Sequence, residues 1–568
     1  MIAKQLIEPK SIVVVGGSDD IHKPGGTVLR NLQDGNFKGS LYVVNPKMDE
    51  VQGIKAYRDV KDLPEVDCAI LAIAAKFCPS TVEVLAKQKN TKAFIILSAG
   101  FHEENEEGAK LERQIVETIN SVGGSLIGPN CIGVLTNHYS GVFTSPIPEL
   151  NPQGVDLISG SGATALFIMD SGMQKGIKFN SMYSVGNSAQ LGVEEILEYM
   201  DESFDPKTSS RVKLLYVESI EKPEKLLKHA SSLIRKGCRI AAVKSGGSAA
   251  GSRAASSHTG ALASSDVAVE ALFRKAGIVR CNGRDELMTV AGIFMHPEMK
   301  GRNMAVVTHA GGPAVMLTDA LSNGGMDVPH IEGEKAQELL GKLFAGSSVG
   351  NPIDFLATGT AEQLGYILDA CDRDFDNIDG MAVIFGSPGL FPVFDVYNVL
   401  DEKMKTSKKP IFPIFPSSKI VKDEIAEFVS KGRVYFPDEV LFGNALCKIY
   451  KTPAPQPEHF EMPDMDVKKI REVVDNAQNG YLSPDEIHAL LDAAGVARAK
   501  EGVSDNEEEI VKMAKEIGFP LVMKVVGPIH KSDVGGVVLN VSDEETVRRE
   551  FKRMMQIKDT YAIMLAQQ

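Results

Sequence analysis

The sequence predicts an α/β protein with three doubly wound domains in series. Three times along the chain an apolar strand runs into a glycine-rich turn and then into a helical pattern, at SIVVVGGS (11–18), VDLISGSGATALF (155–167) and MAVVTHAGGPAVML (304–317). These starts lie about 145 residues apart, which is the length of one such domain. Between them, short apolar runs alternate with polar helical stretches, as in the parallel sheets of Rossmann- and flavodoxin-like domains.

The expected domain boundaries follow from these starts and from one proline-rich segment. TPAPQPEHFEMPDMD carries four prolines and no apolar periodicity, which is typical of an extended linker. The expected ranges are 1–145, 146–297 and 298–451 for the three domains, 452–466 for the linker and 467–568 for a further unit. In that unit Ser483 and Glu486 have the capping-box spacing of a helix start, and FPLVMKVV and GGVVLNV are expected strands.

Composition excludes several classes of protein. The seven cysteines include no CxxC pair, which indicates reduced thiols rather than disulfides or structural zinc. No apolar run is long enough to cross a bilayer, and no signal peptide precedes the first strand. The formal net charge is -14 and no basic cluster stands out, which disfavours nucleic acid. We therefore expect a cytoplasmic protein with no membrane and no nucleic-acid partner.

The first glycine turn, GGSDDIHKPGG, lacks the GxGxxG pattern of a dinucleotide site. The strand after it ends in Asn45 and Lys47, where an NAD site needs an acidic residue for the ribose. A cation at this place suits a nucleotide with a phosphate on its ribose, such as coenzyme A. The alternative is that Lys47 is a solvated loop residue.

The second and third turns each open a helix with glycines. Gly160-Ser161-Gly162 begins a G-x-G-x-x-A pattern, and Gly311-Gly312 stands at the start of the third helix. A helix N-terminus offers free N–H donors and about half a positive charge, which is worth roughly 0.3–1 kcal/mol to a bound anion. Two such starts could hold one phosphoryl group from both sides, although tight turns of this kind are also common for structural reasons.

His258 lies in RAASSHTGALASSD, where most neighbours are small, and it follows a strand-like run, IAAVKSGGS, and an expected loop of small residues. No histidine, cysteine or carboxylate stands at metal-ligand spacing from it, and the chain has no GxSxG elbow of a serine hydrolase. The remaining chemical role for His258 is that of a nucleophile, because an imidazole nitrogen can accept a phosphoryl group and small neighbours leave room for that group. The alternative is a loop histidine that caps backbone groups.

Several longer motifs follow one another along the chain: IGPNCIGV (127–134), SVGN (184–187), KSGGSAAGSRAASSHTGALA (244–263), VVTHAGGPAV (306–315), NPID (351–354) and HKSDVGGV (530–537). With these motifs the chain resembles the NDP-forming acyl-CoA synthetases, the ADP-forming acetyl-CoA synthetase family related to succinyl-CoA synthetase. The resemblance implies three Rossmann/flavodoxin-like doubly wound domains in series plus an N-terminal part of an ATP-grasp domain (α+β). It also implies the reversible reaction of acyl-CoA, ADP and phosphate to carboxylic acid, CoA and ATP through an acyl phosphate and a phosphohistidine.

The resemblance further implies roles for single residues in the first three domains. The positions that match coenzyme A-binding residues are Ser18, Lys47, Ser98 and Asn130. The positions that match the paired helix starts facing the phosphoryl group are Ser161, Gly162, Gly311 and Gly312. His258 matches the phosphorylated histidine, and Glu218 matches the carboxylate that orients its imidazole.

In the ATP-grasp part, Lys524 matches the lysine that binds the nucleotide phosphates of ATP or ADP, and His530 matches a histidine that relays the phosphoryl group toward ADP. A solvated lysine and a loop histidine are the alternatives. The family places the acidic Mg2+ ligands in a region that has no counterpart in this sequence. The resemblance therefore implies that another polypeptide completes the site, that the sequence is truncated, or that transfer to ADP cannot be finished.

The chain also departs from the family at two motif positions, with Gln190 in place of an acid and His309 in place of an asparagine. The implied partners are a small carboxylic acid, its CoA thioester, and either a second copy of the chain or a chain that supplies the rest of the ATP-grasp domain. The competing function is a CoA- or acyl-CoA-sensing regulatory module. We expect the enzyme, because a binding-only module has no use for both His258 and Glu218.

Overall fold

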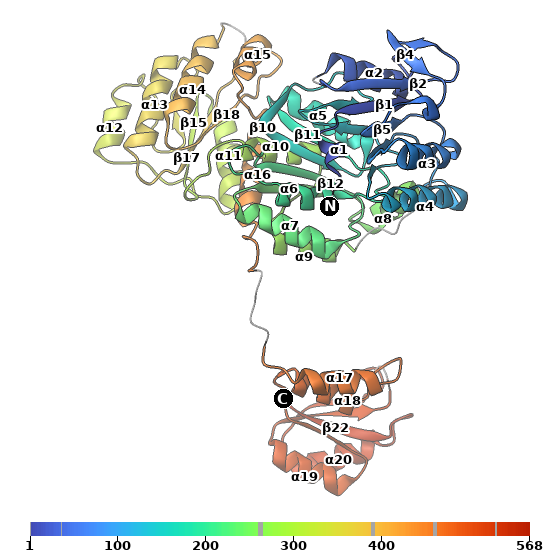
Figure 1. Cartoon of the computed structure of the whole chain (residues 1–568). Helices are drawn as coiled ribbons and strands as arrows, with labels where there is room; N and C mark the ends of the chain where they lie inside the picture. Colours follow the sequence, from blue (N-terminus) through green and yellow to red (C-terminus); the bar gives the residue numbers. More distant parts are fainter. Residues whose placement is uncertain (1, 36, 260–264, 388–391, 458–462, 529–530) are drawn as a thin grey trace. The chain divides into compact units, whose positions relative to one another are not determined.

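The structure, a computed structural model, describes residues 2–35, 37–259, 265–387, 392–457, 463–528 and 531–568. The chain divides into two compact units, Met1–Gln456 and Pro457–Gln568. The first unit runs from blue to orange in Figure 1 and the second from orange to red. Among the described helices, none combines the length and the apolar composition that a membrane span requires.

The first sheet has the strand order β3-β4-β2-β1-β5-β6-β7, and its pairs are parallel apart from that of β3 with β4. Its strands are β1 (Ser11–Val15), β2 (Ser40–Val44), β3 (Glu50–Val51), β4 (Ile54–Tyr57), β5 (Cys68–Leu71), β6 (Ala93–Ile96) and β7 (Ser125–Ile127). The helices of this region are α1 (Lys4–Ile7), α2 (Pro24–Asp34), α3 (Cys78–Gln88) and α4 (Glu106–Ser121), with the 3-10 turns η1 (Val60–Asp62) and η2 (Ala75–Phe77). Along β1, Ile12 and Val14 face one core while Val13 and Val15 face another, so both faces are buried.

The second sheet has the order β14-β13-β12-β10-β11-β8-β9. Its strands are β8 (Gly133–Leu135), β9 (Ser140–Val142), β10 (Leu150–Ser159), β11 (Phe179–Ser184), β12 (Val212–Val217), β13 (Arg239–Lys244) and β14 (Val279–Cys281). The helices of this region are α5 (Gly162–Gln174), α6 (Val193–Glu202), α7 (Pro223–Arg235), α8 (Ala249–Thr259), α9 (Asp266–Ala276) and α10 (Arg284–Phe294). The strands from β10 to β14 pair in parallel, as the alternation of strands and helices in the sequence predicts.

Strands β8 and β9 join the second sheet although they precede the second glycine turn in the chain. β8 pairs antiparallel with both β11 and β9. Tyr139, between the two strands, is fully buried, and its hydroxyl donates to the carbonyl of Leu6 at 2.7 Å. The side-chain amide of Asn31 in α2 donates to the carbonyls of Val142 and Thr144 at 2.6 and 2.9 Å. The first and second sheets therefore share one hydrophobic core.

The third sheet has the order β16-β15-β17-β18, and all of its pairs are parallel. Its strands are β15 (Met304–Thr308), β16 (Ile353–Asp354), β17 (Gly380–Ile384) and β18 (Ile411–Ile414). The helices of this region are α11 (Gly311–Asn323), α12 (Glu334–Leu340), α13 (Ala361–Arg373), α14 (Phe394–Thr406), α15 (Lys422–Ser430) and α16 (Glu439–Lys451). Leu214 of β12 and Val306 of β15 face the same core, in which α16 packs against α10 and α11 (Figure 1). The three parallel sheets of the first unit are thus joined through two shared cores.

The first residues of the expected linker are attached to the second sheet region. The N–H of Gln456 donates to the carbonyl of Lys275 at 3.0 Å, and Arg235 donates to the carbonyl of Gln456. Pro455 lies against Gly277, where a Cβ atom would come within 2.9 Å of the proline ring. The part of the linker at 458–462 lies outside the described residues.

The second unit is an antiparallel sheet with helices, in the order β19-β22-β20-β21. Its strands are β19 (Glu501–Ser504), β20 (Leu521–Val526), β21 (Val537–Val541) and β22 (Ala562–Gln567), and its helices are α17 (Val467–Asn476), α18 (Pro484–Ala493), α19 (Glu507–Ile517) and α20 (Glu544–Met554). The predicted capping box is confirmed, because the Ser483 hydroxyl accepts from the N–H of Glu486 at 3.3 Å and the Glu486 carboxylate accepts from the N–H of Ser483 at 2.7 Å. The predicted strands FPLVMKVV and GGVVLNV are β20 and β21.

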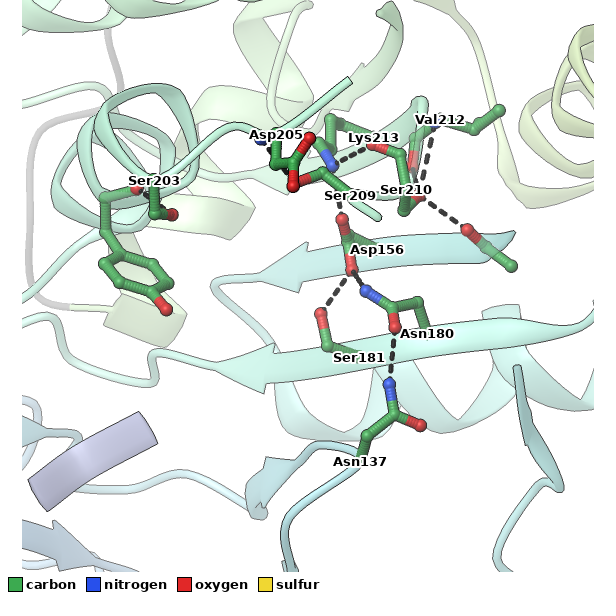
Figure 2. Close-up of polar contacts among 12 residues, drawn as sticks. Asn137, Asp156, Asn180, Ser181, Ser203, Asp205, Ser209, Ser210, Val212 and Lys213 are labelled. Atoms are coloured by element: carbon green, nitrogen blue, oxygen red, sulfur yellow. Dashed lines mark hydrogen bonds and ion pairs between the residues drawn. The ribbon is translucent and has the colours of Figure 1, made fainter. Parts of the chain in front are cut away.

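A buried ion pair joins the second sheet near the amino ends of its strands (Figure 2). Asp156 of β10 is the register partner of Lys213 on β12 and of Ser181 on β11. Lys213 Nζ lies 2.5 Å from Asp156 Oδ2, and the two side chains are 2% and 4% exposed. Lys213 also donates to the carbonyl of Ser210 at 2.6 Å, while Asp156 Oδ1 accepts from Ser181 at 2.6 Å and from Asn180 at 2.7 Å. Both charges are therefore paired and hydrogen-bonded, as burial requires.

Lys213→Met is expected to destabilise the second sheet by about 3–5 kcal/mol, because it leaves the charge of Asp156 buried without its cation. The measurement is hydrogen exchange of the β10 and β12 amides, which reports the free energy of local opening. Lys207→Met is the matched control, since Lys207 is exposed, and it is expected to change that free energy by less than about 0.5 kcal/mol. Equal protection of these amides from exchange in the two variants would show that the ion pair does not stabilise the sheet.

Candidate functional site

A cavity of about 670 Å³ lies where the carboxyl ends of the first and second sheets meet. Its lining comes from the segments that follow β6 and β7 in the first sheet and β10, β11 and β12 in the second. Parallel α/β sheets bind ligands in this position, outside the carboxyl ends of their strands. Four of the expected site residues line the cavity: Asn130, Ser161, Gly162 and Glu218.

The start of α5 reaches the cavity in a fixed backbone conformation. Ser159, the last residue of β10, donates its hydroxyl to the carbonyl of Ser161 at 2.7 Å and accepts from the N–H of Ser161 at 3.2 Å. The Ser161 hydroxyl in turn caps the helix by accepting from the N–H of Thr164 at 3.4 Å. At Gly162 a Cβ atom would lie 2.6 Å from Ile132 Cγ2, so the close approach of these two residues requires glycine.

The start of α11 in the third sheet repeats this local arrangement. Thr308, the last residue of β15, donates its hydroxyl to the carbonyl of Ala310 at 2.8 Å and accepts from the N–H of Ala310 at 2.9 Å. Gly311 and Gly312 are the first residues of the helix, and the space around the Cα of Gly312 is open. The two glycines are not among the described residues that line the cavity.

Glu218 directly follows β12, is partly buried, and lines the cavity. His258 falls in α8, and its side chain lies outside the described residues, as does all of His530. The prediction of a loop before His258 is therefore wrong, because residues 249–259 form a helix. The serines and the glycine of this segment are typical of a loop, but its alanines are strong helix formers.

The other residues expected to bind coenzyme A lie at the carboxyl ends of the first sheet's strands but outside the cavity lining. Ser18 follows β1, and its hydroxyl accepts from the N–H of Asp20 at 3.1 Å. Lys47 follows β2 and is exposed. Ser98 follows β6 and donates to the carbonyl of Ile73. These positions and the cavity thus share one edge of the first sheet.

Glu103 and Asn187 form a polar contact across the first and second sheets at the cavity, which the sequence analysis missed. Asn187 Nδ2 donates to Glu103 Oε2 at 2.5 Å and to Glu112 Oε2 at 3.3 Å. Glu103 Oε1 also accepts from the N–H of Gly100 at 2.7 Å. Burial raises the pKa of Glu103, but the hydrogen bonds from Asn187 and from the backbone outweigh it, so this pKa lies below its ordinary value. Asn187 belongs to the quoted SVGN motif, yet no pattern in the sequence indicates its partners.

Gln190, one of the two departures from the family motifs, links the second sheet region to the first. Its Oε1 accepts from the N–H of Leu126 at 2.6 Å. Its Nε2 donates to Asn120 Oδ1 at 2.6 Å and to the carbonyl of Gly124 at 3.2 Å. An ionised carboxylate at this position has no donors for the last two bonds. The substitution therefore supports packing between the two sheets.

The second departure, His309, lies at the end of β15 beside the start of α11. Its ring stacks on Phe385 with the centroids 4.3 Å apart. Its Nδ1 atom is buried and has no hydrogen-bond partner among the described residues. Burial lowers the pKa of His309, although hydrogen bonds to the backbone of Ile384 and Gly386 act in the opposite direction. The imidazole is therefore held in its neutral form more strongly than an exposed one.

The two glutamates that α6 contributes to the cavity accept hydrogen bonds from nearby backbone N–H groups and lysines. Glu194 Oε1 accepts from the backbone N–H groups of Glu221 and Lys222 at 2.9 and 3.1 Å. Glu195 Oε1 lies 2.8 Å from Lys222 Nζ and 3.1 Å from Lys225 Nζ. Burial raises the pKa of Glu195, but these lysines and the backbone outweigh it and the pKa lies below its ordinary value. Nearby backbone N–H groups and lysines therefore offset the negative charge of these two carboxylates.

In the second unit, Lys524 lies in β20 between β21 and β22, opposite Val537 and Met564. Its side chain is partly buried. Lys524 is therefore held by a central strand of the antiparallel sheet.

Family models match three regions of the chain in succession. A CoA binding domain matches residues 10–137, a succinyl-CoA ligase like flavodoxin domain matches residues 152–294, and an ATP-grasp domain matches residues 473–563. The first two regions contain the strands that surround the cavity.

Two curated relatives match nearly the whole chain, and a third matches 75% of it. The chain is 32% identical to the ADP-forming acetate–CoA ligase I of Archaeoglobus fulgidus, over 98% of this chain and 80% of the relative. It is 30% identical to the ADP-forming 4-hydroxybutyrate–CoA ligase of Nitrosopumilus maritimus, over 99% of this chain and 81% of the relative. It is also 32% identical to subunit alpha of the ADP-forming acetate–CoA ligase II of Pyrococcus furiosus, over 75% of this chain and 92% of the relative.

A solved structure from Ca. Korarchaeum cryptofilum has the same fold. It is a dinucleotide forming acetyl-coenzyme A synthetase 1 in complex with phosphate and ADP, and it superposes with a TM-score of 0.71 at 26% identity, over 79% of this chain and 96% of that chain. The same family is indicated by the order of the matched regions, by the sequence identity along the chain and by the shared fold. The chain belongs to the family of ADP-forming acyl-CoA ligases, the NDP-forming acyl-CoA synthetases.

Proposed function

We propose that the protein interconverts acyl-CoA, ADP and phosphate with a carboxylic acid, CoA and ATP, through an acyl phosphate and a phosphohistidine. One observation carries this proposal: a single cavity holds the start of α5 and Glu218 against the region that matches a CoA binding domain. The relatives named above, which are ligases of acetate and 4-hydroxybutyrate, support the reaction class. The acyl group of this protein is a small carboxylic acid in this proposal.

The proposal assigns the phosphate to the start of α5, with Ser161 and Gly162 at the site. The first N–H groups of a helix have no partner within the helix and carry partial positive charge, so they stabilise a bound anion. The hydrogen bonds between Ser159 and Ser161 hold this turn before any ligand arrives. Gly311 and Gly312 at the start of α11 are assigned as the second, opposed donor set for the same phosphoryl group.

The proposal assigns the covalent step to His258. Its imidazole takes the phosphoryl group from the acyl phosphate and releases the carboxylic acid, and later gives the phosphoryl group to ADP. Glu218, at the end of β12 in the cavity, orients the imidazole and stabilises its charge, which is the usual role of a carboxylate beside a nucleophilic histidine.

Coenzyme A is assigned to the carboxyl edge of the first sheet, with Ser18, Lys47, Ser98 and Asn130 as the binding residues. The described structure fits such a ligand, because helix α2 begins at this edge with no side-chain cap on its first N–H groups. Lys47 is exposed beside the same edge and is assigned to the phosphate on the ribose. Asn130 lines the cavity, where the thiol end of the ligand has to arrive.

In the second unit, Lys524 is assigned to the phosphates of ADP or ATP, and His530 to the relay of the phosphoryl group. Mg2+ accompanies ATP in such reactions by neutralising phosphate charge. The described residues bring together no group of three or more histidine, cysteine, aspartate or glutamate side chains fit to hold a metal ion. The proposal therefore assigns no residue of the described chain to Mg2+.

The domain assignment proposed with this function keeps the ranges expected from the sequence. They are 1–145 for CoA binding, 146–297 for the phosphohistidine domain, 298–451 for the second flavodoxin-like domain, 452–466 for the linker and 467–568 for the ATP-grasp part. A Pyrococcus furiosus relative is one subunit of a larger ligase. We propose that this chain likewise works in an assembly, with a second copy of itself or with a second polypeptide.

His258→Asn is expected to abolish labelling of the protein when acetyl-CoA and labelled inorganic phosphate are added, because the N–P bond then has no acceptor. The wild type is expected to carry acid-labile, base-stable label, and Glu218→Gln is expected to acquire it roughly 100-fold more slowly. His330→Asn is the control, since His330 is exposed in the third sheet region. Coenzyme A binding without label in the wild type would instead favour the sensing module.

Lys47→Met is expected to weaken the binding of coenzyme A roughly 3- to 10-fold, because an exposed cation loses its contact with the ribose phosphate. The binding of dephospho-CoA, which lacks that phosphate, is expected to stay unchanged. Isothermal titration of both ligands measures the difference, with the exposed Lys61→Met as the control. An equal loss for both ligands would remove Lys47 from the proposed site.

A further inference from the structure

The cavity contains one imidazole that the proposed function leaves without a role. His102 follows β6 and lines the cavity together with Asn130, Ser161 and Glu218. Its Nδ1 atom lies 2.7 Å from Glu112 Oε1, and its side chain is 31% exposed. Its Nε2 atom has no hydrogen-bond partner among the described residues. One nitrogen is thus held by a carboxylate while the other remains available to a ligand.

Glu112 is itself held in place. It lies in α4, its side chain is 13% exposed, and its Oε2 atom accepts from Asn187 Nδ2 at 3.3 Å. The order Asn187, Glu112, His102 therefore repeats the geometry in which a carboxylate fixes the orientation of a catalytic imidazole. The hydrogen bond to Glu112 raises the pKa of His102, and burial lowers it by a smaller amount. The charges of Glu112, Glu103 and Glu221, which face the ring, also raise this pKa.

The proposed reaction needs a base at this place. Thioester formation requires the thiol of coenzyme A to attack the carbonyl carbon of the acyl phosphate, and a free thiol is only a few per cent thiolate at neutral pH. Coenzyme A reaches the cavity from the edge of the first sheet, on which His102 lies, and the acyl phosphate is held at the start of α5. Under the proposed function the thiol therefore enters the cavity that Asn130, Ser161 and His102 line.

Three other carboxylates of the cavity have partners of their own. Glu103, Glu194 and Glu195 accept hydrogen bonds from Asn187, from backbone N–H groups and from lysines, as described above. Glu218 is assigned to His258. Burial raises the pKa of the Cys131 thiol to about 12, so this group does not take up a proton from another thiol near neutral pH.

We propose that His102 is the general base that deprotonates the thiol of coenzyme A, and that Glu112 positions it; this inference rests on the proposed function. His102 Nε2 takes the S–H proton, and the sulfur forms a bond with the carbonyl carbon of the acyl phosphate. The C–O bond to the phosphate breaks, and the departing phosphate receives the proton from His102. In the reverse direction the phosphate gives that proton to His102, which returns it to the leaving thiolate.

The test separates this step from phosphorylation of the protein. Acetyl phosphate is added with coenzyme A, and thioester formation is followed for the wild type, His102→Gln and Glu112→Gln. Acetyl phosphate is also added in labelled form without coenzyme A, and the label on the protein is followed. His138→Gln is the matched control, because His138 is an exposed histidine that also pairs with a carboxylate, at 3.5 Å from Glu8.

We expect His102→Gln to lower the rate of thioester formation by about 10²–10⁴-fold and to leave phosphorylation of the protein unchanged. The wild-type rate is expected to rise with pH as His102 loses its proton, and His102→Gln is expected to lack that rise. Above about pH 9 the deficit of His102→Gln is expected to shrink, because thiolate then forms without a base. Glu112→Gln is expected to move the rise to lower pH, since Glu112 raises the pKa of His102.

Wild-type thioester formation in His102→Gln would overturn the inference and leave the proposed function in place. Equal losses of thioester formation and of phosphorylation would also overturn it, because such losses indicate a structural role. Absence of both reactions in the wild type would overturn the proposed function and this inference together. Coenzyme A affinity serves as the further readout, and it is expected to be the same in His102→Gln and the wild type.

Discussion

The pairing of β8 and β9 with the second sheet is the constraint on which the site depends. These strands come from the end of the first sheet's chain segment, and Tyr139 and Asn31 tie them back to it through hydrogen bonds to Leu6, Val142 and Thr144. The two sheets consequently share a core, and their carboxyl edges face one cavity. Residues that act together must keep their positions to within about 0.5 Å, and a shared core holds the two edges of this cavity in that way.

The elements with strong local patterns could be predicted from the sequence. The apolar runs before the glycine turns are β1, β10 and β15. Helices α5 and α11 begin at the glycines, whereas α2 begins only at Pro24, after a longer loop. The hydroxyl of Ser483 caps a helix as its spacing with Glu486 predicts. In such places a few neighbouring residues determine the local structure, so apolar periodicity and capping residues are sufficient to predict it.

Contacts between distant segments could not be predicted in this way. Strands as short as β8 and β9 carry too few residues for a periodic pattern, and β11, with which β8 pairs, lies far along the chain. The contact of Glu103 and Glu112 with Asn187 exists only because two sheets are oriented against each other. Helix α8 was missed for a different reason, since its serines and its glycine favour a loop while its alanines favour a helix.

The hydroxyl groups that hold the starts of α5 and α11 have a consequence for how such an enzyme can change over time. In both places the backbone turn is fastened by the final side chain of the strand, Ser159 or Thr308. Because each turn is fastened by the strand before it, substitutions elsewhere in the chain can accumulate without moving either helix start.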